Sequence, residues 1–354
     1  MTRQSKHQLI FSNSSKMSEL KDQSIQLIVT SPPYPMIEMW DELFSKLNPK
    51  TAESLLELNG NQAFKLMHQE LDKTWQECHR VLSPGGIACI NIGDATRKLG
   101  DRFRLYSNHS RITESFHHLG FDNLPLILWR KQTNAPNKFM GSGMLPSGAY
   151  VTLEHEYILI FRKGPKRDFT RESDKSTRQE SAFFWEERNA WFSDIWDFKG
   201  VKQRIATDKT RHRSAAYPFE LAYRLINMYS VKGDLVLDPF LGTGTTVIAA
   251  IASNRNSIGI EMDANLKDLI NTNILSSGDS IKSYTKERYN RHISFVRDYE
   301  ATKGKLNYIN NYHGFPVMTS QERSLKLDIL DSIKNGSDGN LLADYSENNF
   351  PSTG

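Results

Sequence analysis

Short apolar runs alternate along the chain with segments of helical periodicity, and this alternation constrains the fold more than any other feature. Ser24–Thr30 and Ile87–Ile92 have the near-continuous apolar character of strands that are buried on both faces. Between them, Gln62–Leu82 has apolar residues at helical spacing, and Ser83–Gly86 ends that helix with a proline and two glycines. Strands that alternate with helices predict an α/β fold, in which a mostly parallel, twisted sheet carries helices on both faces.

The same reading extends through the rest of the chain. Further strands are predicted at Leu124–Arg130, Glu156–Phe161, Asp234–Leu237 and Asn256–Ile260, and further helices at Pro218–Ser230, Gly242–Ala252, Ile281–Tyr299 and Gln321–Ile333. Arg162–Lys209 departs from this pattern because it is polar and charged, with a cluster of aromatic residues. We interpret Arg162–Lys209 as an inserted segment rather than as part of the core.

Composition excludes several classes of protein. The chain has 354 residues, enough for one large domain with insertions or for two modest domains. Met1–Lys16 is polar and lacks the apolar region of a secretory signal, and no apolar run approaches the roughly 20 residues that cross a bilayer. Cys78 and Cys89 lie in apolar-patterned segments, which argues against a disulfide framework or a zinc site. We therefore expect a cytoplasmic protein with no membrane partner and no metal.

Positive charge concentrates in the middle of the chain. Arg97–Lys138 contains eight Lys or Arg residues against three Asp or Glu residues, and Lys163–Arg213 contains thirteen against nine. Basic stretches raise the affinity for phosphate backbones, although two solvated surfaces would have the same composition.

A glycine turn between a strand and a helix is the first candidate site. Asp238–Thr246 contains Gly242 and Gly244, which permit a tight turn and a close approach of the backbone to a ligand. The start of the following helix presents free N–H groups to an anionic group. Glu261 lies 23 residues after Asp238, at the end of the next strand, where a carboxylate can accept hydrogen bonds from ribose hydroxyls. The turn matches neither the dinucleotide fingerprint nor the phosphate-binding P-loop, and a purely structural turn is the alternative.

The second candidate site is the loop Ser31–Tyr34, with the sequence Ser-Pro-Pro-Tyr, which ends the first predicted strand. The amino group on an aromatic base is a poor nucleophile because its lone pair is delocalised into the ring. The Ser31 hydroxyl and the Pro32 carbonyl can accept the amino hydrogens, localise that lone pair and stabilise the positive charge that develops during transfer. Pro32 and Pro33 hold these acceptors in place, and Tyr34 offers a flat face for an extruded base. The alternative is a proline-capped strand end with a buried tyrosine.

Together these segments resemble the amino-DNA methyltransferases. Ile28–Tyr34 is similar to their motif IV, Asp238–Thr246 to motif I, Gly259–Glu261 to motif II and Ala215–Leu221 to motif X. Arg80–Gly86, Asn91–Asp94 and His155–Ile158 fit the intervening segments. Because the catalytic motif precedes the cofactor motif, the order is the circularly permuted one of the β class. The resemblance covers about residues 10–265 and implies a Rossmann-like S-adenosylmethionine-dependent methyltransferase fold with an inserted target-recognition region.

The resemblance also assigns roles to residues. It implies that Asp238, Pro239, Phe240, Gly242 and Gly244 surround the methionine part of the cofactor, that Glu261 binds its ribose and that Met262 packs on its adenine. Weaker candidates for cofactor contact are Thr30, Thr245, Tyr217 and Pro218. The acidic adenine contact of many relatives is replaced here by Ser12–Ser14, which leaves Asn13 as the candidate. The corresponding division of the chain is 1–163 for the first catalytic part, 164–213 for target recognition, 214–265 for the cofactor-binding part and 266–354 for a helical extension of unknown role.

Serine at the first position of motif IV resembles the enzymes that methylate cytosine N4, whereas N6-adenine enzymes usually carry Asp or Asn there. Neither cysteine follows a proline, which excludes the covalent route of the carbon-5 cytosine methyltransferases. The expected function is therefore N4-cytosine methylation of duplex DNA without a covalent intermediate, by a monomer or homodimer working beside a restriction endonuclease. The alternatives are N6-adenine methylation, a catalytically silent DNA-binding module and, least favoured, a nicotinamide dehydrogenase.

Basic residues in two segments are the candidates for DNA contact, because Arg and Lys bind phosphates and read base edges. These residues are Arg97, Arg102, Arg167, Arg171, Arg178, Lys199, Lys202 and Arg204. For each of them a solvated surface charge is the alternative, and the recognised DNA sequence does not follow from the chain.

Overall fold

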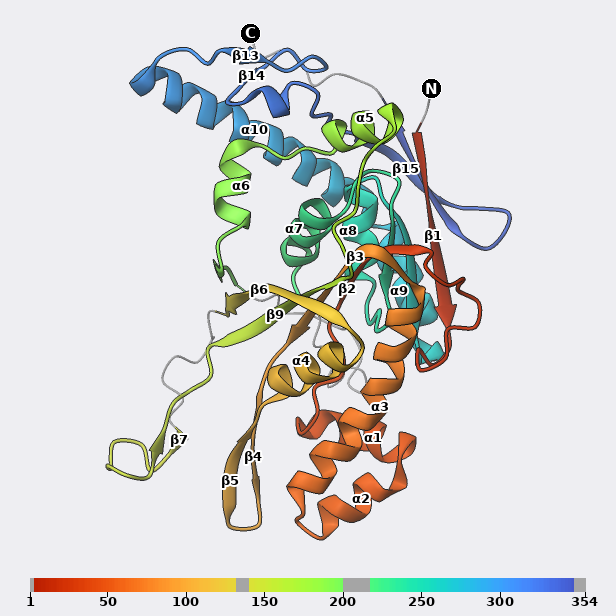
Figure 1. The fold of residues 1–354 in the computed structure, drawn as a ribbon, viewed down its shortest axis with the longest axis vertical. Coiled ribbons are helices and arrows are strands. Elements are labelled where there is room, and N and C mark those ends of the chain that lie inside the picture. Colours follow the sequence, from red (N-terminus) through yellow and green to blue (C-terminus); the bar gives the residue numbers. More distant parts are fainter. Residues whose placement is uncertain (1–2, 132–139, 200–216, 347–354) are drawn as a thin grey trace.

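One large sheet organises the molecule (Figure 1). The computed structural model describes residues 3–131, 140–199 and 217–346. Within these ranges the sheet has ten strands, in the order β10 (Ile195–Asp197), β6 (Phe121–Arg130), β9 (His155–Lys163), β3 (Leu82–Ile92), β2 (Ile25–Thr30), β11 (Leu235–Asp238), β12 (Asn256–Glu261), β1 (Arg3–Phe11), β16 (Leu341–Ser346) and β15 (Ile329–Asn335).

The centre of the sheet is parallel. Strands β3, β2, β11, β12 and β1 run in one direction, and β10 is parallel to β6. Strand β9 is antiparallel to both β3 and β6, and β16 is antiparallel to β1 and β15. This arrangement confirms the predicted α/β fold with a mostly parallel sheet.

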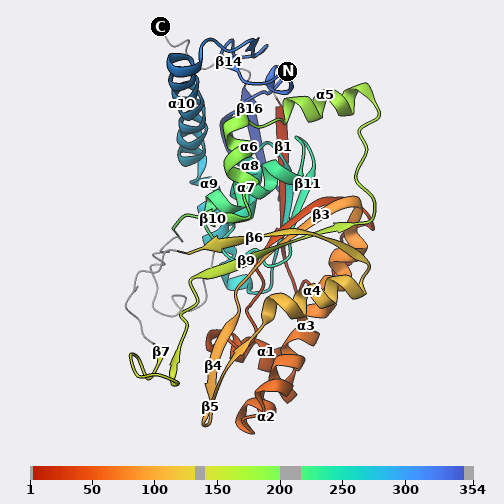
Figure 2. The same cartoon turned by 60° about the vertical axis from the view of Figure 1, so that its left-hand side comes forward.

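Helices cover both faces of the sheet (Figures 1 and 2). On one face α3 (Gly60–Val81) and α4 (Asn108–His118) contribute Trp75 and Phe116 to a core that includes Ile28 of β2. On the other face α7 (Phe219–Tyr229) and α8 (Thr245–Ala252) pack against the side chains of Leu27 and Val29. Because neighbouring residues of a strand point to opposite faces, β2 is apolar along almost its whole length.

The other elements lie around this framework. The remaining helices are α1 (Asp41–Leu47), α2 (Pro49–Leu56), α5 (Glu172–Glu180), α6 (Trp185–Trp191), α9 (Lys267–Leu275) and α10 (Gly278–Lys303), with 3-10 turns at Glu38–Trp40, Ala264–Leu266 and Ser320–Glu322. In the part of the chain that the structure describes, small hairpins pair β4 (Ala95–Leu99) with β5 (Arg102–Tyr106), β7 (Met140–Gly141) with β8 (Ala149–Tyr150), and β13 (Tyr308–Ile309) with β14 (Pro316–Val317).

Three aromatic residues of the predicted insertion, Phe184, Trp191 and Trp196, belong to the core, which corrects our interpretation of Arg162–Lys209, whereas Trp185 and Phe192 are exposed. Trp191 and Trp196 are buried with Leu221 of α7 on one face of the sheet. Phe184 is fully buried in a separate cluster with Phe315. Helix α5 has no buried residue, and in α6 Glu186 and Glu187 turn inward to pair with His292 and Arg288 of α10. The average composition of the segment therefore concealed its packing.

The C-terminal part is not purely helical, which corrects two further expectations. The predicted helix at Ile281–Tyr299 is part of α10, whereas Gln321–Ile333 contains only a 3-10 turn and the start of strand β15. Strands β15 and β16 extend the sheet beyond β1, so the last strands of the chain pair with the first.

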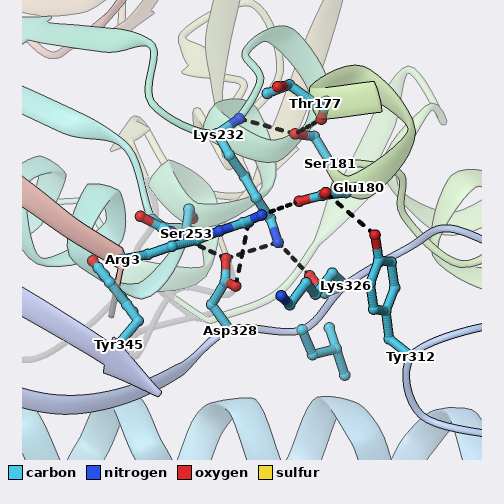
Figure 3. Close-up of polar contacts among 12 residues, drawn as sticks. Arg3, Thr177, Glu180, Ser181, Lys232, Ser253, Tyr312, Lys326, Asp328 and Tyr345 are labelled. Atoms are coloured by element: carbon cyan, nitrogen blue, oxygen red, sulfur yellow. Dashed lines mark hydrogen bonds and ion pairs between the residues drawn. The ribbon is translucent and has the colours of Figure 1, made fainter. Parts of the chain in front are cut away.

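A polar cluster, most of it buried, joins four separate parts of the chain at the edge of the sheet where β1 begins (Figure 3). Asp328 lies 2.7 Å from Lys232 Nζ and 3.8 Å from an Arg3 guanidinium nitrogen. Arg3 also pairs with Glu180 of α5, at 2.6 Å, and the Lys232 backbone N–H donates to the Ser181 hydroxyl. Burial lowers the pKa of Lys232 to about 8.

Neither a membrane-spanning helix nor a metal-binding cluster is found within residues 3–131, 140–199 and 217–346. No helix there is long and apolar enough to span a membrane. No group of three or more His, Cys, Asp or Glu side chains in the same ranges is arranged to hold a metal ion. Cys78 and Cys89 are free thiols, and both are buried.

Candidate active site

The predicted catalytic and cofactor loops meet at the carboxyl edge of the parallel strands. Ser31 follows β2, Asp238 ends β11 and Glu261 ends β12, and these three strands are consecutive in the sheet. From β2 the chain continues to one side of the sheet through β3, and from β11 it continues to the other side through β12. The gap between β2 and β11 is therefore the point at which α/β sheets bind their ligands.

A single cavity of about 470 Å³ separates the two loops. From the catalytic loop it is lined by Ser31, Pro32 and Pro33, and from the cofactor motifs by Pro239, Phe240, Gly242, Thr245, Glu261 and Met262. Asn13 and Tyr217 also line it, as do Met39 and Trp40 of the 3-10 turn before α1 and Leu43 of α1 itself. Most of the catalytic and cofactor residues expected from the sequence thus line one cavity.

The two glycines of the turn have different roles. Both adopt positive φ angles, +56° at Gly242 and +95° at Gly244, which favour glycine. A Cβ atom at Gly242 would meet only the Phe240 carbonyl oxygen, at 4.0 Å, so the space beside this glycine is open. A Cβ atom at Gly244 would approach Ile274 of α9 to 3.3 Å. Gly242 therefore leaves room for a ligand, whereas Gly244 permits the turn and the packing of α9.

Glu261 is held in position before any ligand binds. Its two carboxylate oxygens accept hydrogen bonds from the backbone N–H groups of Gly242 and Asp263, both at 2.9 Å. Burial raises the pKa of Glu261. Each oxygen keeps a further lone pair, so the carboxylate can accept bonds from a pair of ribose hydroxyls. With the exposed Met262 thioether beside it, this set of groups fits the ribose and adenine of S-adenosylmethionine.

The side chains of Asp238 and Thr30 lie beneath the two loops rather than on the cavity wall, and their expected contact with the cofactor stays a prediction. Both side chains are buried, and neither lines the cavity. The Asp238 carboxylate accepts bonds from Thr30 Oγ1 at 2.6 Å, from the Phe240 N–H at 3.0 Å and from the Tyr217 hydroxyl at 3.2 Å. It also accepts a bond from Thr246 Oγ1. Asp238 therefore ties the catalytic loop to the glycine turn.

A second polar network lies beneath the catalytic loop. Ser31 Oγ donates to the Tyr34 hydroxyl at 3.2 Å, and this hydroxyl donates to Glu156 Oε2 at 3.0 Å. Asn91 Nδ2 donates to Glu156 Oε2 at 2.7 Å and to the Tyr34 oxygen at 2.9 Å. Lys131 pairs with the other Glu156 oxygen. Burial, with the neighbouring carboxylate, raises the pKa of Tyr34 well above its usual value.

Sequence reasoning assigned no role to Asn91, Lys131 or Glu156. Asn91 lies near the end of β3, Lys131 follows β6 and Glu156 lies near the start of β9. Because β9 is antiparallel to its neighbours, its first residues reach the same edge at which β3 and β6 end. A polar residue at the end of each of three apolar strands was the available signal. Tyr34 does not line the cavity and reaches it through Ser31.

Three of the basic residues predicted to contact DNA lie at the opposite edge of the sheet. Arg167 pairs with Asp234, at 2.7 Å, just before β11 begins. Arg171 precedes α5 and Arg178 lies on it, and the last residue of α5, Glu180, pairs with Arg3 at the start of β1 (Figure 1). The structure therefore does not bring these three arginines to the cavity.

Other basic candidates lie at the same edge as the cavity. Arg102 is exposed on the hairpin β4–β5, which follows β3, and Lys199 is exposed just after β10. Arg97 lies in the same hairpin, but its guanidinium forms two hydrogen bonds with the Asp41 carboxylate of α1, at 2.7 and 2.6 Å. Lys202 and Arg204 lie outside the described residues.

Comparison with known proteins gives a consistent result. A family model described as DNA methylase matches residues 25–272. The type II methyltransferase M.MthZI of Methanothermobacter thermautotrophicus is 57% identical over 323 residues, which cover 91% of this chain and 90% of the relative. The type II methyltransferase M.MjaI of Methanocaldococcus jannaschii is 53% identical over 279 residues, covering 76% and 91%.

A solved structure agrees with these relatives. A candidate DNA modification methylase of Thermus thermophilus, TTHA0409, solved in complex with S-adenosyl-L-methionine, superposes with a TM-score of 0.58. It is 30% identical, and the match covers 76% of this chain and 95% of that protein.

Proposed function

This chain belongs to the family of S-adenosylmethionine-dependent DNA methylases that act on amino groups, and from that premise we propose that it methylates the N4 amino group of cytosine in duplex DNA. The observation that carries the choice of base is Ser31. A neutral hydroxyl at the head of the catalytic loop resembles the N4-cytosine enzymes, and Ser31 lines the same cavity as Gly242 and Glu261.

The chemistry assigned to the chain is positioning and electrostatic. When bound, S-adenosylmethionine supplies a methyl group on an electron-poor sulfur. Glu261 holds the ribose, and the open space at Gly242 admits the part of the molecule that carries the sulfur. Ser31 Oγ and the Pro32 carbonyl accept the two hydrogens of the amine, which directs its lone pair toward the methyl group.

Access to a base inside a duplex requires that the base leave the stack. The cavity lies at the edge of the sheet, where Arg102 and Lys199 are exposed and can neutralise phosphates. We place the DNA on this edge, and we withdraw Arg167, Arg171 and Arg178 from the proposed contacts because they lie at the other one.

The proposed biological role is the modification half of a restriction–modification system. Two relatives that match most of this chain are named type II methyltransferases, which supports a role in protecting a short site from a partner endonuclease. The oligomeric state, monomer or homodimer, stays a prediction. The dehydrogenase alternative has no support in the family match.

Analysis of the methylated product tests the choice of base. The protein is incubated with labelled S-adenosylmethionine and mixed plasmid DNA, and the DNA is then digested to nucleosides and weighed. We expect N4-methylcytosine as the labelled product. N6-methyladenine alone would refute the choice of cytosine while leaving the family assignment intact. Failure to bind S-adenosylmethionine in a calorimeter would instead favour the catalytically silent module.

A further inference from the structure

Glu156 is a buried carboxylate whose oxygens are all engaged. The residue is 7% exposed. One oxygen pairs with Lys131, and the other accepts bonds from the Tyr34 hydroxyl at 3.0 Å and from Asn91 Nδ2 at 2.7 Å. A buried carboxylate is expensive unless it is paired and hydrogen-bonded, so the three donors explain how it persists. They do not explain why an acidic group stands beneath the catalytic loop.

The hydrogen bonds of Tyr34 have one direction. An ionised carboxylate only accepts hydrogen bonds, so the single Tyr34 proton points to Glu156. The Tyr34 oxygen then accepts from Asn91 Nδ2 at 2.9 Å and from the Ser31 hydroxyl at 3.2 Å. The Ser31 proton is thereby directed away from the cavity. Its oxygen receives one further contact, from Asn91 Nδ2 at 3.5 Å, which is too long to be a strong bond.

We propose that Glu156 is a positioning residue for methyl transfer. It fixes the direction of the hydrogen bonds that run from Ser31 through Tyr34 to Glu156, and so leaves a lone pair of Ser31 Oγ free for the target amine. The negative charge of the Glu156 carboxylate also polarises the hydroxyls of Tyr34 and Ser31, which makes Ser31 a better hydrogen-bond acceptor as positive charge develops on the amine. The inference rests on the proposed transfer to an amine, and it holds for cytosine and adenine alike.

The same series of hydrogen bonds gives the proton that leaves the methylated amine a route to Glu156. After transfer, an N–H bond of the methylated amine breaks and its proton binds Ser31 Oγ. The original Ser31 proton passes to the Tyr34 oxygen, and the Tyr34 proton passes to Glu156 Oε2. The products are a neutral N-methyl amine and a neutral carboxylic acid beside Lys131, and loss of that proton to solvent restores the carboxylate.

Exchange of the carboxylate for an amide distinguishes this role from packing. In Glu156→Gln the side-chain NH₂ can donate to Tyr34, which lets Tyr34 donate to Ser31 and occupy the lone pair that the amine needs. We expect the single-turnover rate of methyl transfer to fall about tenfold or more, while the dissociation constants for S-adenosylmethionine and DNA change less than about threefold. Tyr34→Phe, which keeps the ring, should lose a similar factor.

Two further measurements distinguish the loss of these hydrogen bonds from a general structural effect of the substitution. The double variant Tyr34→Phe/Glu156→Gln should be no slower than the slower single variant, because both changes break the same series of hydrogen bonds. The Glu156→Gln rate should also rise with pH more steeply than the wild-type rate, since hydroxide replaces the missing proton acceptor. The titratable groups that contact Glu156 in the described residues are Tyr34 and Lys131, and both remain in this variant.

Glu154→Gln is the matched control, because Glu154 is exposed two residues earlier in the chain, and it should leave the rate unchanged. The inference is overturned if Glu156→Gln transfers methyl groups within about twofold of wild type, or if its loss lies wholly in weaker binding. If Glu156→Gln fails to fold, a fully active Tyr34→Phe variant overturns it. Wild-type protein that transfers no methyl group would contradict the proposed function instead.

Discussion

The hydroxyl of Ser31 is the one side-chain group that belongs to both the cavity and the polar network beneath it. Ser31 lines the same cavity as Gly242 and Glu261, and its hydroxyl hydrogen-bonds to Tyr34. A hydroxyl has two acceptor lone pairs and one proton, so its ability to accept a hydrogen bond from the target amine depends on where that proton points. At the scale of single residues, the site therefore depends on orientation more than on the strength of any one group.

Ser31→Ala removes the side-chain acceptor and leaves the Pro32 carbonyl and the prolines in place. We expect the single-turnover rate of methyl transfer to fall about a hundredfold, as it does when one preorganised partner of a transition state is lost. S-adenosylmethionine should bind as in wild type, because Glu261 and the glycine turn are untouched, and calorimetry checks this. Ser276→Ala, at an exposed position, is the control. Full activity of Ser31→Ala would remove the hydroxyl from the mechanism.

At the scale of elements, β1 is held to its neighbours by polar side chains that are buried. His7 is fully buried and lies 2.8 Å from Ser5 Oγ and 2.8 Å from Ser257 Oγ of β12. Ser5 Oγ in turn lies 2.8 Å from the Tyr345 hydroxyl of β16. Burial lowers the pKa of His7 to about 3, so the imidazole is neutral in the folded protein at neutral pH.

His7 makes stability depend on pH in a defined direction. Between about pH 6.5 and about pH 3, the unfolded chain binds a proton at this residue and the folded protein does not. The free energy of unfolding therefore decreases as the pH falls through this window, by about 1.4 kcal/mol per pH unit for one proton. In urea unfolding measured at several pH values, the slope of the free energy of unfolding against pH should be lower by that amount in His7→Gln. His118→Gln, at an exposed position, should have the wild-type slope. Equal slopes in His7→Gln and wild type would contradict the assignment.

The elements that could be predicted are those whose residues reveal their own environment. Strands β2, β3, β11 and β12 are buried on both faces, so each is an apolar run that indicates a strand. Strand β1 was not predicted, because its buried positions include Ser5 and His7, which look like surface residues until their partners are known. Trp191 of α6 and Trp196 of β10 were not predicted to be core residues, because many of their neighbours in the sequence are charged or polar.

Part of the candidate site could likewise be predicted from the sequence, and part of it could not. The loop at Ser31–Tyr34 and the turn at Gly242–Gly244 are local sequences whose chemistry can be recognised without a fold. The network that contains Asn91, Lys131 and Glu156 draws on the ends of three strands, and it exists only because β9 runs antiparallel between β3 and β6. No local pattern places such residues together.

At the scale of the whole molecule, the edge of the sheet opposite the cavity holds the N-terminus, the α5 segment and the C-terminal part together (Figure 3). Lys232, Asp328, Arg3 and Glu180 come from four separate stretches of the chain and form three ion pairs among themselves. Asn254 Nδ2 also donates to Asp328, at 2.8 Å. The cluster lies away from the cavity, so its proposed contribution is to stability rather than to transfer.

Breaking the pair between Lys232 and Asp328 tests this contribution. Lys232→Met leaves the Asp328 carboxylate buried without its nearest cation, and the free energy of unfolding should fall by about 3–5 kcal/mol. In Lys232→Met/Asp328→Asn no uncompensated charge remains, so the double variant should recover part of that loss, as measured by urea unfolding. Folded protein of both variants should keep the wild-type affinity for S-adenosylmethionine, because the cavity lies at the other edge. A single variant as stable as wild type, or a double variant less stable than the single, would show that the ion pair does not hold these segments together.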